Sequence, residues 1–187
     1  MTDNMKPIER IMRAASVIPV LVINDPADAK PMAEDLVAKG YPVLEVTLRT
    51  DCALDAIREM KKVEGAIVGA GTVLNATMLD AAISEGAEFI VSPGLTEALG
   101  KMAIERDVPL LPGVANAGDI MRGLDLGLTH FKFFPAVANG GIPALKSLAG
   151  PFGQCKFCPT GGITETTAPN WLELDSVLCV GGSWVSG

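Results

Sequence analysis

Histidine is almost absent from this chain, which has a single one, His130, among 187 residues. One imidazole cannot build a multi-histidine metal site, and it argues against a serine–histidine–aspartate relay. Acid–base chemistry must therefore come from carboxylates, lysine, hydroxyl groups or water. His130 stands at the entry to an apolar segment, and we expect it to lie on the surface.

Long apolar runs and an excess of positive charge are also lacking. No apolar run approaches the roughly 18 residues that span a bilayer, and the first residues, 1–7, contain no apolar signal-peptide segment. We therefore expect a soluble, cytoplasmic protein with no membrane partner. The net charge of -7 argues against a nucleic-acid surface, although it allows one local cationic pocket for an anionic metabolite.

Cysteine is sparse, with four residues at positions 52, 155, 158 and 179. In a cytosolic chain such cysteines are typical of reduced thiols and not of a disulfide framework. Cys155 and Cys158 have the spacing of a metal or redox motif, but there is no second pair, and Cys158 lies in an apolar, strand-like segment. We interpret both as small buried hydrophobic residues and expect neither a metal nor a cofactor.

What the chain has in abundance is a repeating unit of apolar strand, turn and amphipathic helix. The expected strand cores are Ile18–Ile23, Val43–Leu48, Ala66–Ala70, Phe89–Val91, Pro109–Leu111, Phe131–Phe134, Lys156–Cys158 and Val177–Val180. Helical patterns include Ile8–Ala15, Ala29–Lys39, Cys52–Val63, Ala76–Glu85, Glu97–Arg106 and Ile142–Leu148. Alternating strands and helices predict a parallel sheet, and eight units match a closed (β/α)₈ barrel, the TIM barrel.

No linker divides the chain, so we expect one domain over residues 1–187, with residues 1–16 as an N-terminal helix. An open, doubly wound sheet is the alternative fold, but the chain lacks the Gly-x-Gly-x-x-Gly turn of dinucleotide-binding sheets. The printed sequence ends soon after Val180, so we expect the structure to lack the helix that would follow the eighth strand.

The segment 129–136 contains one lysine in an apolar strand. Alternation places Lys132 and Phe134 on one face and Phe131 and Phe133 on the other, so both faces look buried. Burial favours the uncharged amine, which is a nucleophile that can form a Schiff base with a carbonyl substrate. The alternatives are an edge-strand lysine that blocks aggregation and a lysine whose amine reaches solvent.

The second strand carries further inward charge. Its alternation directs Glu45, Thr47 and Arg49 into the barrel and leaves Leu44 and Val46 facing the helices. Inward charges are costly unless they pair or bind a ligand. A structural Glu45–Arg49 ion pair is one interpretation; a functional site that includes Lys132 is the other.

Small and hydroxyl residues follow several strands at the end where barrel sites lie. They are Ala70-Gly71-Thr72, Ser92-Pro93-Gly94, Thr160-Gly161-Gly162 and Gly181-Gly182-Ser183. The glycine pairs after the seventh and eighth strands allow backbone N–H groups to approach an anion, so they favour a phosphate site over ordinary turns.

Together these segments resemble the bacterial 2-keto-3-deoxy-6-phosphogluconate (KDPG) and 4-hydroxy-2-oxoglutarate (KHG) aldolase family. The resemblance covers nearly the whole chain and rests on residues 43–50, 68–74, 92–96, 131–136, 157–163 and 179–184. It implies a (β/α)₈ barrel that assembles as a homotrimer, needs no metal and cleaves its substrate in the Entner–Doudoroff pathway to pyruvate and glyceraldehyde 3-phosphate.

The resemblance also implies roles for individual residues. Lys132 corresponds to the Schiff-base lysine and Glu45 to the carboxylate that moves protons. The substrate-binding residues are Arg49, Thr72, Pro93 and Thr160. The phosphate-binding residues are Gly161, Gly162, Gly182 and Ser183.

The sequence departs from the family pattern at Val137, where a glutamate is common, and this change could alter the loop after the sixth strand. Two other functions stay open. One is a related aldolase or decarboxylase that acts on 4-hydroxy-2-oxoglutarate, oxaloacetate or the galactonate-derived epimer. The other is a non-catalytic barrel that binds a phosphorylated metabolite and uses Lys132 only as an anion contact.

Overall fold

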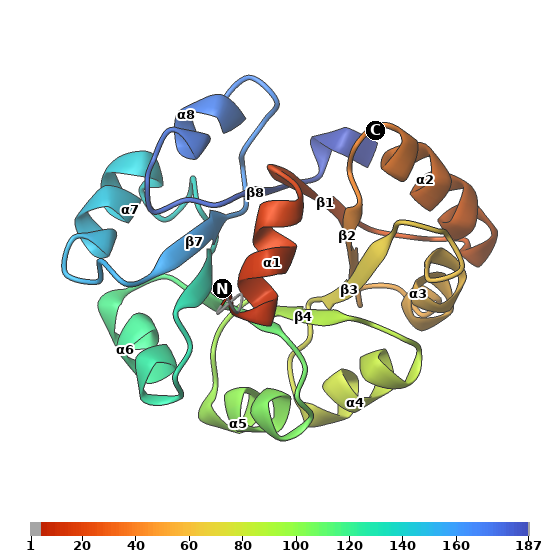
Figure 1. The fold of residues 1–187 in the computed structure, drawn as a ribbon, viewed down its shortest axis with the longest axis horizontal. Coiled ribbons are helices and arrows are strands. Elements are labelled where there is room, and N and C mark those ends of the chain that lie inside the picture. Colours follow the sequence, from red (N-terminus) through yellow and green to blue (C-terminus); the bar gives the residue numbers. More distant parts are fainter. Residues whose placement is uncertain (1–4, 187) are drawn as a thin grey trace.

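The computed structural model describes residues 5–186, and its strands form one parallel ring (Figure 1). The strands are β1 (Val17–Leu21), β2 (Val43–Thr47), β3 (Ile67–Gly71), β4 (Phe89–Ser92), β5 (Leu110–Val114), β6 (His130–Phe133), β7 (Lys156–Pro159) and β8 (Val180–Gly182). Strands that follow one another in the chain pair in parallel, and β8 pairs with β1. Two isolated bridges, Phe157 to Val177 and Thr160 to Gly181, connect the β7 and β8 segments. The predicted TIM-barrel fold is therefore confirmed.

Helices surround the ring, one between each pair of successive strands (Figure 1). They are α2 (Pro26–Ala38), α3 (Ala53–Met60), α4 (Ala76–Ser84), α5 (Glu97–Glu105), α6 (Ala117–Asp125), α7 (Gly141–Ala149) and α8 (Ala168–Leu172). Several begin where the sequence supplies a side chain that accepts a backbone N–H. Asp25, Asn75, Thr96 and Asn116 cap α2, α4, α5 and α6 in this way.

The two faces of each strand differ because side chains alternate. Leu44 and Val46 of β2 belong to the apolar layer beneath the helices, as the sequence predicted. The interior of the barrel is a separate apolar cluster that includes Val43, Phe89 and Leu111. Glu45 and Thr47 are also fully buried, so β2 carries polar side chains into this interior.

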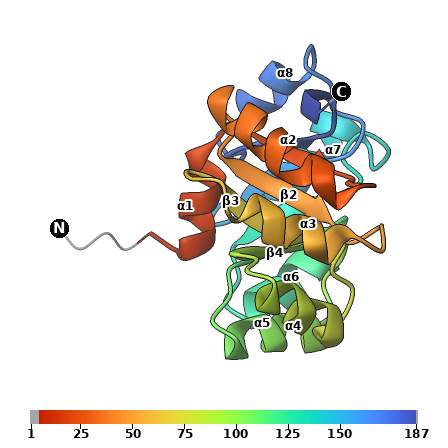
Figure 2. The same ribbon diagram turned by 90° about the vertical axis from the view of Figure 1, so that its right-hand side faces the viewer.

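An additional helix, α1 (Pro7–Ala14), lies across one end of the barrel (Figures 1 and 2). Its buried residues Ile8, Ile11 and Met12 join the cluster inside the barrel. The same cluster includes Ile18, Val43 and Phe89, which lie at the starts of β1, β2 and β4, so α1 closes the amino end of the barrel. The opposite end, where the strands finish, stays open for a site.

His130 is buried, which corrects the expectation of a surface residue. Only 5% of it is exposed, because α1 covers the start of β6. Its Nδ1 lies 3.1 Å from Thr129 Oγ1, and its Nε2 lies 3.4 Å from Glu9 Oε2 of α1. Sequence alternation alone could not reveal this burial, because the covering helix lies far away in the chain.

The eighth strand also differs from its predicted position. We predicted a strand over Val177–Val180, but β8 is Val180–Gly182, because pairing with β1 begins only where Val180 lies beside Val17. Among the described residues, β8 is followed by a 3₁₀ helix, Trp184–Ser186. No helix within residues 5–186 is long and apolar enough to cross a bilayer.

Candidate active site

The centre of the candidate site is a buried pair formed by Lys132 and Glu45. Lys132 Nζ donates a hydrogen bond to Glu45 Oε1 over 3.2 Å, and the two residues are 5% and 3% exposed. Strand alternation brings both side chains inside the barrel, from β6 and β2. A buried amine beside a carboxylate provides a nucleophile and a proton carrier at contact distance.

The pair formed by Glu45 is not the one suggested by sequence proximity. We considered a structural Glu45–Arg49 ion pair, but within residues 5–186 Glu45 pairs with Lys132 instead. The prediction that Arg49 points into the barrel is wrong, because β2 ends at Thr47 and Arg49 lies exposed in the turn that follows. Thr47, which does point inward, donates to the backbone oxygen of Leu21 over 2.8 Å.

Phe134 adds an aromatic surface to the site. Lys132 Nζ lies 5.2 Å from the centroid of its ring. Phe131 and Phe133 instead belong to the apolar cluster outside the strands, so the face assignment made from the sequence holds for β6. An aromatic face attracts a cation and excludes water, so Phe134 favours a dry environment around the amine.

Arg49 and Thr72 meet at the open end of the barrel. Arg49 Nε donates to Thr72 Oγ1 over 3.3 Å. Thr72 has a φ of 59°, in the left-handed region that β-branched residues rarely adopt. Backbone strain of this kind is concentrated at functional sites, and here it accompanies a hydroxyl group that lies beside the Arg49 guanidinium.

A cavity of about 210 Å³ opens next to these residues. Most of the predicted substrate- and phosphate-binding residues line it, namely Arg49, Thr160, Gly161, Gly162, Gly182 and Ser183, and Phe134 connects it to Lys132. Gly161 and Gly162 have φ values of 103° and 77°, which turn their peptide groups in a way that other residues rarely allow. Such glycine turns can present N–H groups to an anion.

Pro93 is not brought to this cavity. It lines a separate hollow together with Val73, Leu74 and Asp119, and its side chain is exposed. Thr72 also does not line the 210 Å³ cavity and reaches it only through Arg49.

Val137 lies beside the glycine turn of the candidate phosphate site. Its backbone N–H donates to Gly161 O over 3.0 Å, and a Cβ atom on Gly162 would come within 2.8 Å of Val137 Cβ. The loop after β6 and the loop after β7 therefore support each other. The side chain of Val137 is half exposed.

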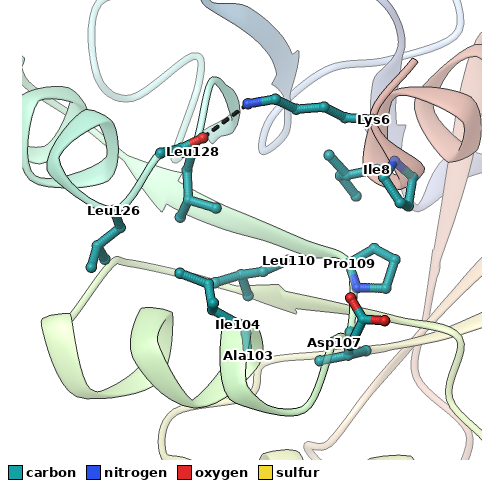
Figure 3. A pocket seen from close by; sticks show the side chains of 12 residues that line it. Lys6, Ile8, Ala103, Ile104, Asp107, Pro109, Leu110, Leu126 and Leu128 are labelled. Atoms are coloured by element: carbon teal, nitrogen blue, oxygen red, sulfur yellow. Dashed lines mark hydrogen bonds between the residues drawn. The ribbon is translucent and has the colours of Figure 1, made fainter. Parts of the chain in front are cut away.

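Another hollow, of about 310 Å³, lies at the other end of the barrel (Figure 3). Leu110, Leu126 and Leu128 form its wall, and Lys6 closes one side by donating to Gly127 O over 2.9 Å. It lies beside α1, at the amino ends of β5 and β6, and it shares no lining residue with the 210 Å³ cavity. It is mainly apolar and offers no convergent catalytic groups.

The four cysteines are free thiols. Burial and a hydrogen bond to the neighbouring Cys158 raise the pKa of Cys179, with the hydrogen bond as the larger cause. Within residues 5–186, no group of three or more histidine, cysteine, aspartate or glutamate residues gathers in a way that would hold a metal ion.

Sequence reasoning missed the importance of two glycines. A Cβ atom on Gly71 would overlap the carboxylate of Glu45, and one on Gly181 would overlap the hydroxyl of Thr160. Both glycines lie within strands and have ordinary negative or extended φ values. The sequence signal for both was a glycine inside a strand, since such a glycine often marks a position where another group approaches the backbone closely.

A closed parallel barrel with a buried lysine–glutamate pair and a rim cavity lined by glycine turns has the architecture of barrel enzymes whose chemistry takes place at the carboxyl ends of the strands. The model of the KDPG and KHG aldolase family matches residues 8–187. The chain therefore belongs to the KDPG and KHG aldolase family, as its sequence motifs indicated.

Individual relatives agree with this family. The chain is 67% identical over 181 residues to the 2-dehydro-3-deoxy-phosphogluconate aldolase of Zymomonas mobilis. The aligned segment covers 97% of this chain and 87% of the relative. It is 54% identical over 178 residues to the KHG/KDPG aldolase of Escherichia coli, and this aligned segment covers 95% of this chain and 84% of the relative. It also superposes on the structure of KDPG aldolase from Legionella pneumophila with pyruvate captured as a covalent carbinolamine, with a TM-score of 0.93 and 45% sequence identity. The match covers 96% of this chain and 88% of that one.

Proposed function

We propose that this protein is a Schiff-base aldolase that cleaves 2-keto-3-deoxy-6-phosphogluconate to pyruvate and glyceraldehyde 3-phosphate. The observation that carries the proposal is the buried contact of 3.2 Å between Lys132 Nζ and Glu45 Oε1. Relatives with 67% and 54% identity bear the names of aldolases of this kind, which supports the same substrate here.

In the proposed reaction, the Lys132 amine attacks the C2 ketone to give a carbinolamine. Loss of water then forms an iminium, which withdraws electrons from the C3–C4 bond. A base removes the proton of the C4 hydroxyl group, the bond breaks, and glyceraldehyde 3-phosphate leaves. The remaining enamine takes a proton at C3, and water releases pyruvate from the lysine.

Glu45 is the proposed proton carrier in these steps. Its Oε1 already contacts Lys132 Nζ, so it lies within reach of the oxygen that leaves from the carbinolamine. Since His130 contacts Glu9 at the amino end of the barrel, it is not placed to share this task. The proposal thus depends on one carboxylate for proton transfer.

The rim residues are proposed to hold the rest of the substrate. Arg49 and Thr72 would bind the carboxylate of the keto acid, since a guanidinium pairs well with a planar carboxylate. Thr160 would contact the aldehyde half. The phosphate would bind at the turns that contain Gly161, Gly162, Gly182 and Ser183, which line one cavity.

The position of Pro93 gives only weak support to a role in substrate binding, since Pro93 lines a different hollow. Its proposed contact with the keto acid part of the substrate rests on the family resemblance. By the same resemblance we propose a single barrel domain, a homotrimer, a cytoplasmic location and a place in the Entner–Doudoroff pathway. Light scattering on the purified protein tests the trimer.

The direct test of the function is a cleavage assay in which pyruvate release is coupled to lactate dehydrogenase. Phosphorylated substrate should be cleaved, and Gly162→Ala should raise KM for it, because Gly162 has a positive φ and an added Cβ atom would crowd Val137. The related function, cleavage of 4-hydroxy-2-oxoglutarate, is favoured by the double name of the Escherichia coli relative. A higher kcat/KM for 4-hydroxy-2-oxoglutarate would make that the better description, and no cleavage of either substrate would overturn the aldolase assignment.

A further inference from the structure

Gly71, at the end of β3, lies directly against the carboxylate of Glu45. A Cβ atom built on Gly71 would come within 2.7 Å of Glu45 Cγ and 2.8 Å of Glu45 Cδ, and it would overlap Oε1. Oε1 is the same oxygen that accepts the hydrogen bond from Lys132. The space that the carboxylate occupies therefore exists only because residue 71 has no side chain.

The glycine is needed for space and not for its backbone conformation. Gly71 does not have a positive φ, and it pairs in regular register with Thr47 of β2. An alanine at this position is therefore compatible with the strand, and its cost is confined to the contact with Glu45.

Glu45 cannot escape this contact by turning its carboxylate. The overlap involves Cγ as well as the carboxyl group, so the whole side chain would have to move. Glu45 is 3% exposed and surrounded by a packed barrel interior, where such a shift requires a strained rotamer. Any shift of Oε1 away from β3 changes its 3.2 Å contact with Lys132.

We propose that Gly71 is a positioning residue that sets the distance between Glu45 and Lys132 by the absence of a side chain. The proposal rests on the proposed function, because it assumes that this distance matters for proton transfer during Schiff-base formation and cleavage. It adds a residue on a third strand, β3, that acts through Glu45.

A double-mutant cycle tests it, with the wild type, Gly71→Ala, Glu45→Ala and the double variant. Gly71→Ala should lower kcat by roughly 10²-fold, as expected when a positioned acid–base group is displaced. Its KM for the keto acid should change little, since alanine is compatible with the backbone at position 71 and leaves the side chains of Arg49 and Thr72 in place. In the Glu45→Ala background, Gly71→Ala should cause no further loss of kcat, because no carboxylate remains to be displaced.

The melting temperature provides a second readout that does not depend on activity. Gly71→Ala should lower the melting temperature of the wild type by crowding the pair. In the Glu45→Ala background it should raise the melting temperature, because the added methyl group fills part of the space left by the deleted side chain. Gly153→Ala is a matched control, since a Cβ at Gly153 would meet no atom within 4 Å, and it should change neither kcat nor the melting temperature.

The outcomes separate this proposal from the aldolase assignment. Loss of kcat that simply adds to that of Glu45→Ala, or a fall in melting temperature in both backgrounds, would overturn the positioning role. A wild-type protein that cleaves no keto acid would overturn the function. The sign change in melting temperature would still reveal whether Gly71 makes room for Glu45.

Discussion

Lys132 and Glu45 are 87 residues apart in the chain, yet Lys132 Nζ lies 3.2 Å from Glu45 Oε1 inside the barrel. The contact joins β6 and β2, which are not neighbouring strands. Neither residue is more than about a twentieth exposed, at 5% for Lys132 and 3% for Glu45. Each residue is therefore the main polar partner of the other in the barrel interior, and this dependence leads to the first prediction.

Removal of one member of the pair should destabilise the protein more than removal of both. Lys132→Met leaves the Glu45 carboxylate buried without its partner, and such losses typically cost about 3–5 kcal/mol. The double variant Lys132→Met/Glu45→Gln should recover part of this stability. Urea unfolding of the two variants and the wild type measures the difference. Equal stability of the single and double variants would mean that the pair is not coupled.

Arg49 should affect substrate binding and leave stability unchanged. Its side chain is exposed and contacts Thr72 Oγ1 at the rim, so Arg49→Gln removes a carboxylate partner without opening the core. We expect KM for the keto acid to rise by about tenfold or more, in line with about 1.5–3 kcal/mol for a hydrogen bond to a charged group. Lys39→Gln, on an exposed part of the surface, is the control. An unchanged KM would remove Arg49 from the proposed site.

The stability of the protein should fall as the pH drops below about 6.5. Burial lowers the pKa of His130 below that of the unfolded chain, although the nearby Glu9 carboxylate opposes the shift and Lys6 and Arg13 reinforce it. Between the folded and the unfolded pKa, His130 is therefore protonated in the unfolded chain and neutral in the folded protein. The stabilisation is complete above the unfolded pKa and is lost as the pH falls toward the folded pKa.

Denaturant unfolding between pH 5 and pH 8 measures this loss, with His130→Gln as the variant that should flatten the curve. The effect is separate from that of Glu9, whose pKa is lowered chiefly by its hydrogen bond with Arg13 and whose titration lies at more acidic pH. The chain has one histidine, so NMR follows its imidazole without ambiguity. A resonance that titrates above the usual histidine range would contradict the prediction.

The helix that closes the amino end of the barrel should contribute strongly to stability. Met12 is fully buried among side chains of the barrel interior, so Met12→Ala should cost about 2–5 kcal/mol. Arg13→Ala, on the exposed side of the same helix, should cost less than about 1 kcal/mol. Thermal or urea unfolding compares the two, and similar losses would show that α1 is not packed as described.

The sequence predicted the parts of the fold that depend on local periodicity. Strand alternation has a period of two residues, so it correctly directed Glu45, Thr47 and Lys132 inward and Leu44 and Val46 outward. The family motifs also identified most of the residues that line the rim cavity.

What the sequence could not predict depends on contacts between distant segments. Arg49 continues the alternation of β2, but the strand ends at Thr47, so the alternation argument failed two residues past its end. The burial of His130 depends on α1, and the role of Gly71 depends on the exact path of the Glu45 side chain. The helix at 117–125 was not predicted, since it contains Gly118 and Gly123; the latter makes room for Phe131.

The central claim is that Lys132 captures a keto acid covalently, and borohydride reduction tests it most directly. The protein is incubated with pyruvate, reduced, digested and analysed by mass spectrometry, with Lys132→Met and unreduced samples as controls. The account predicts one stable pyruvate adduct on the peptide that contains Lys132, and none in the variant. Absence of an adduct on the wild-type protein, or an adduct on a different lysine, would contradict it.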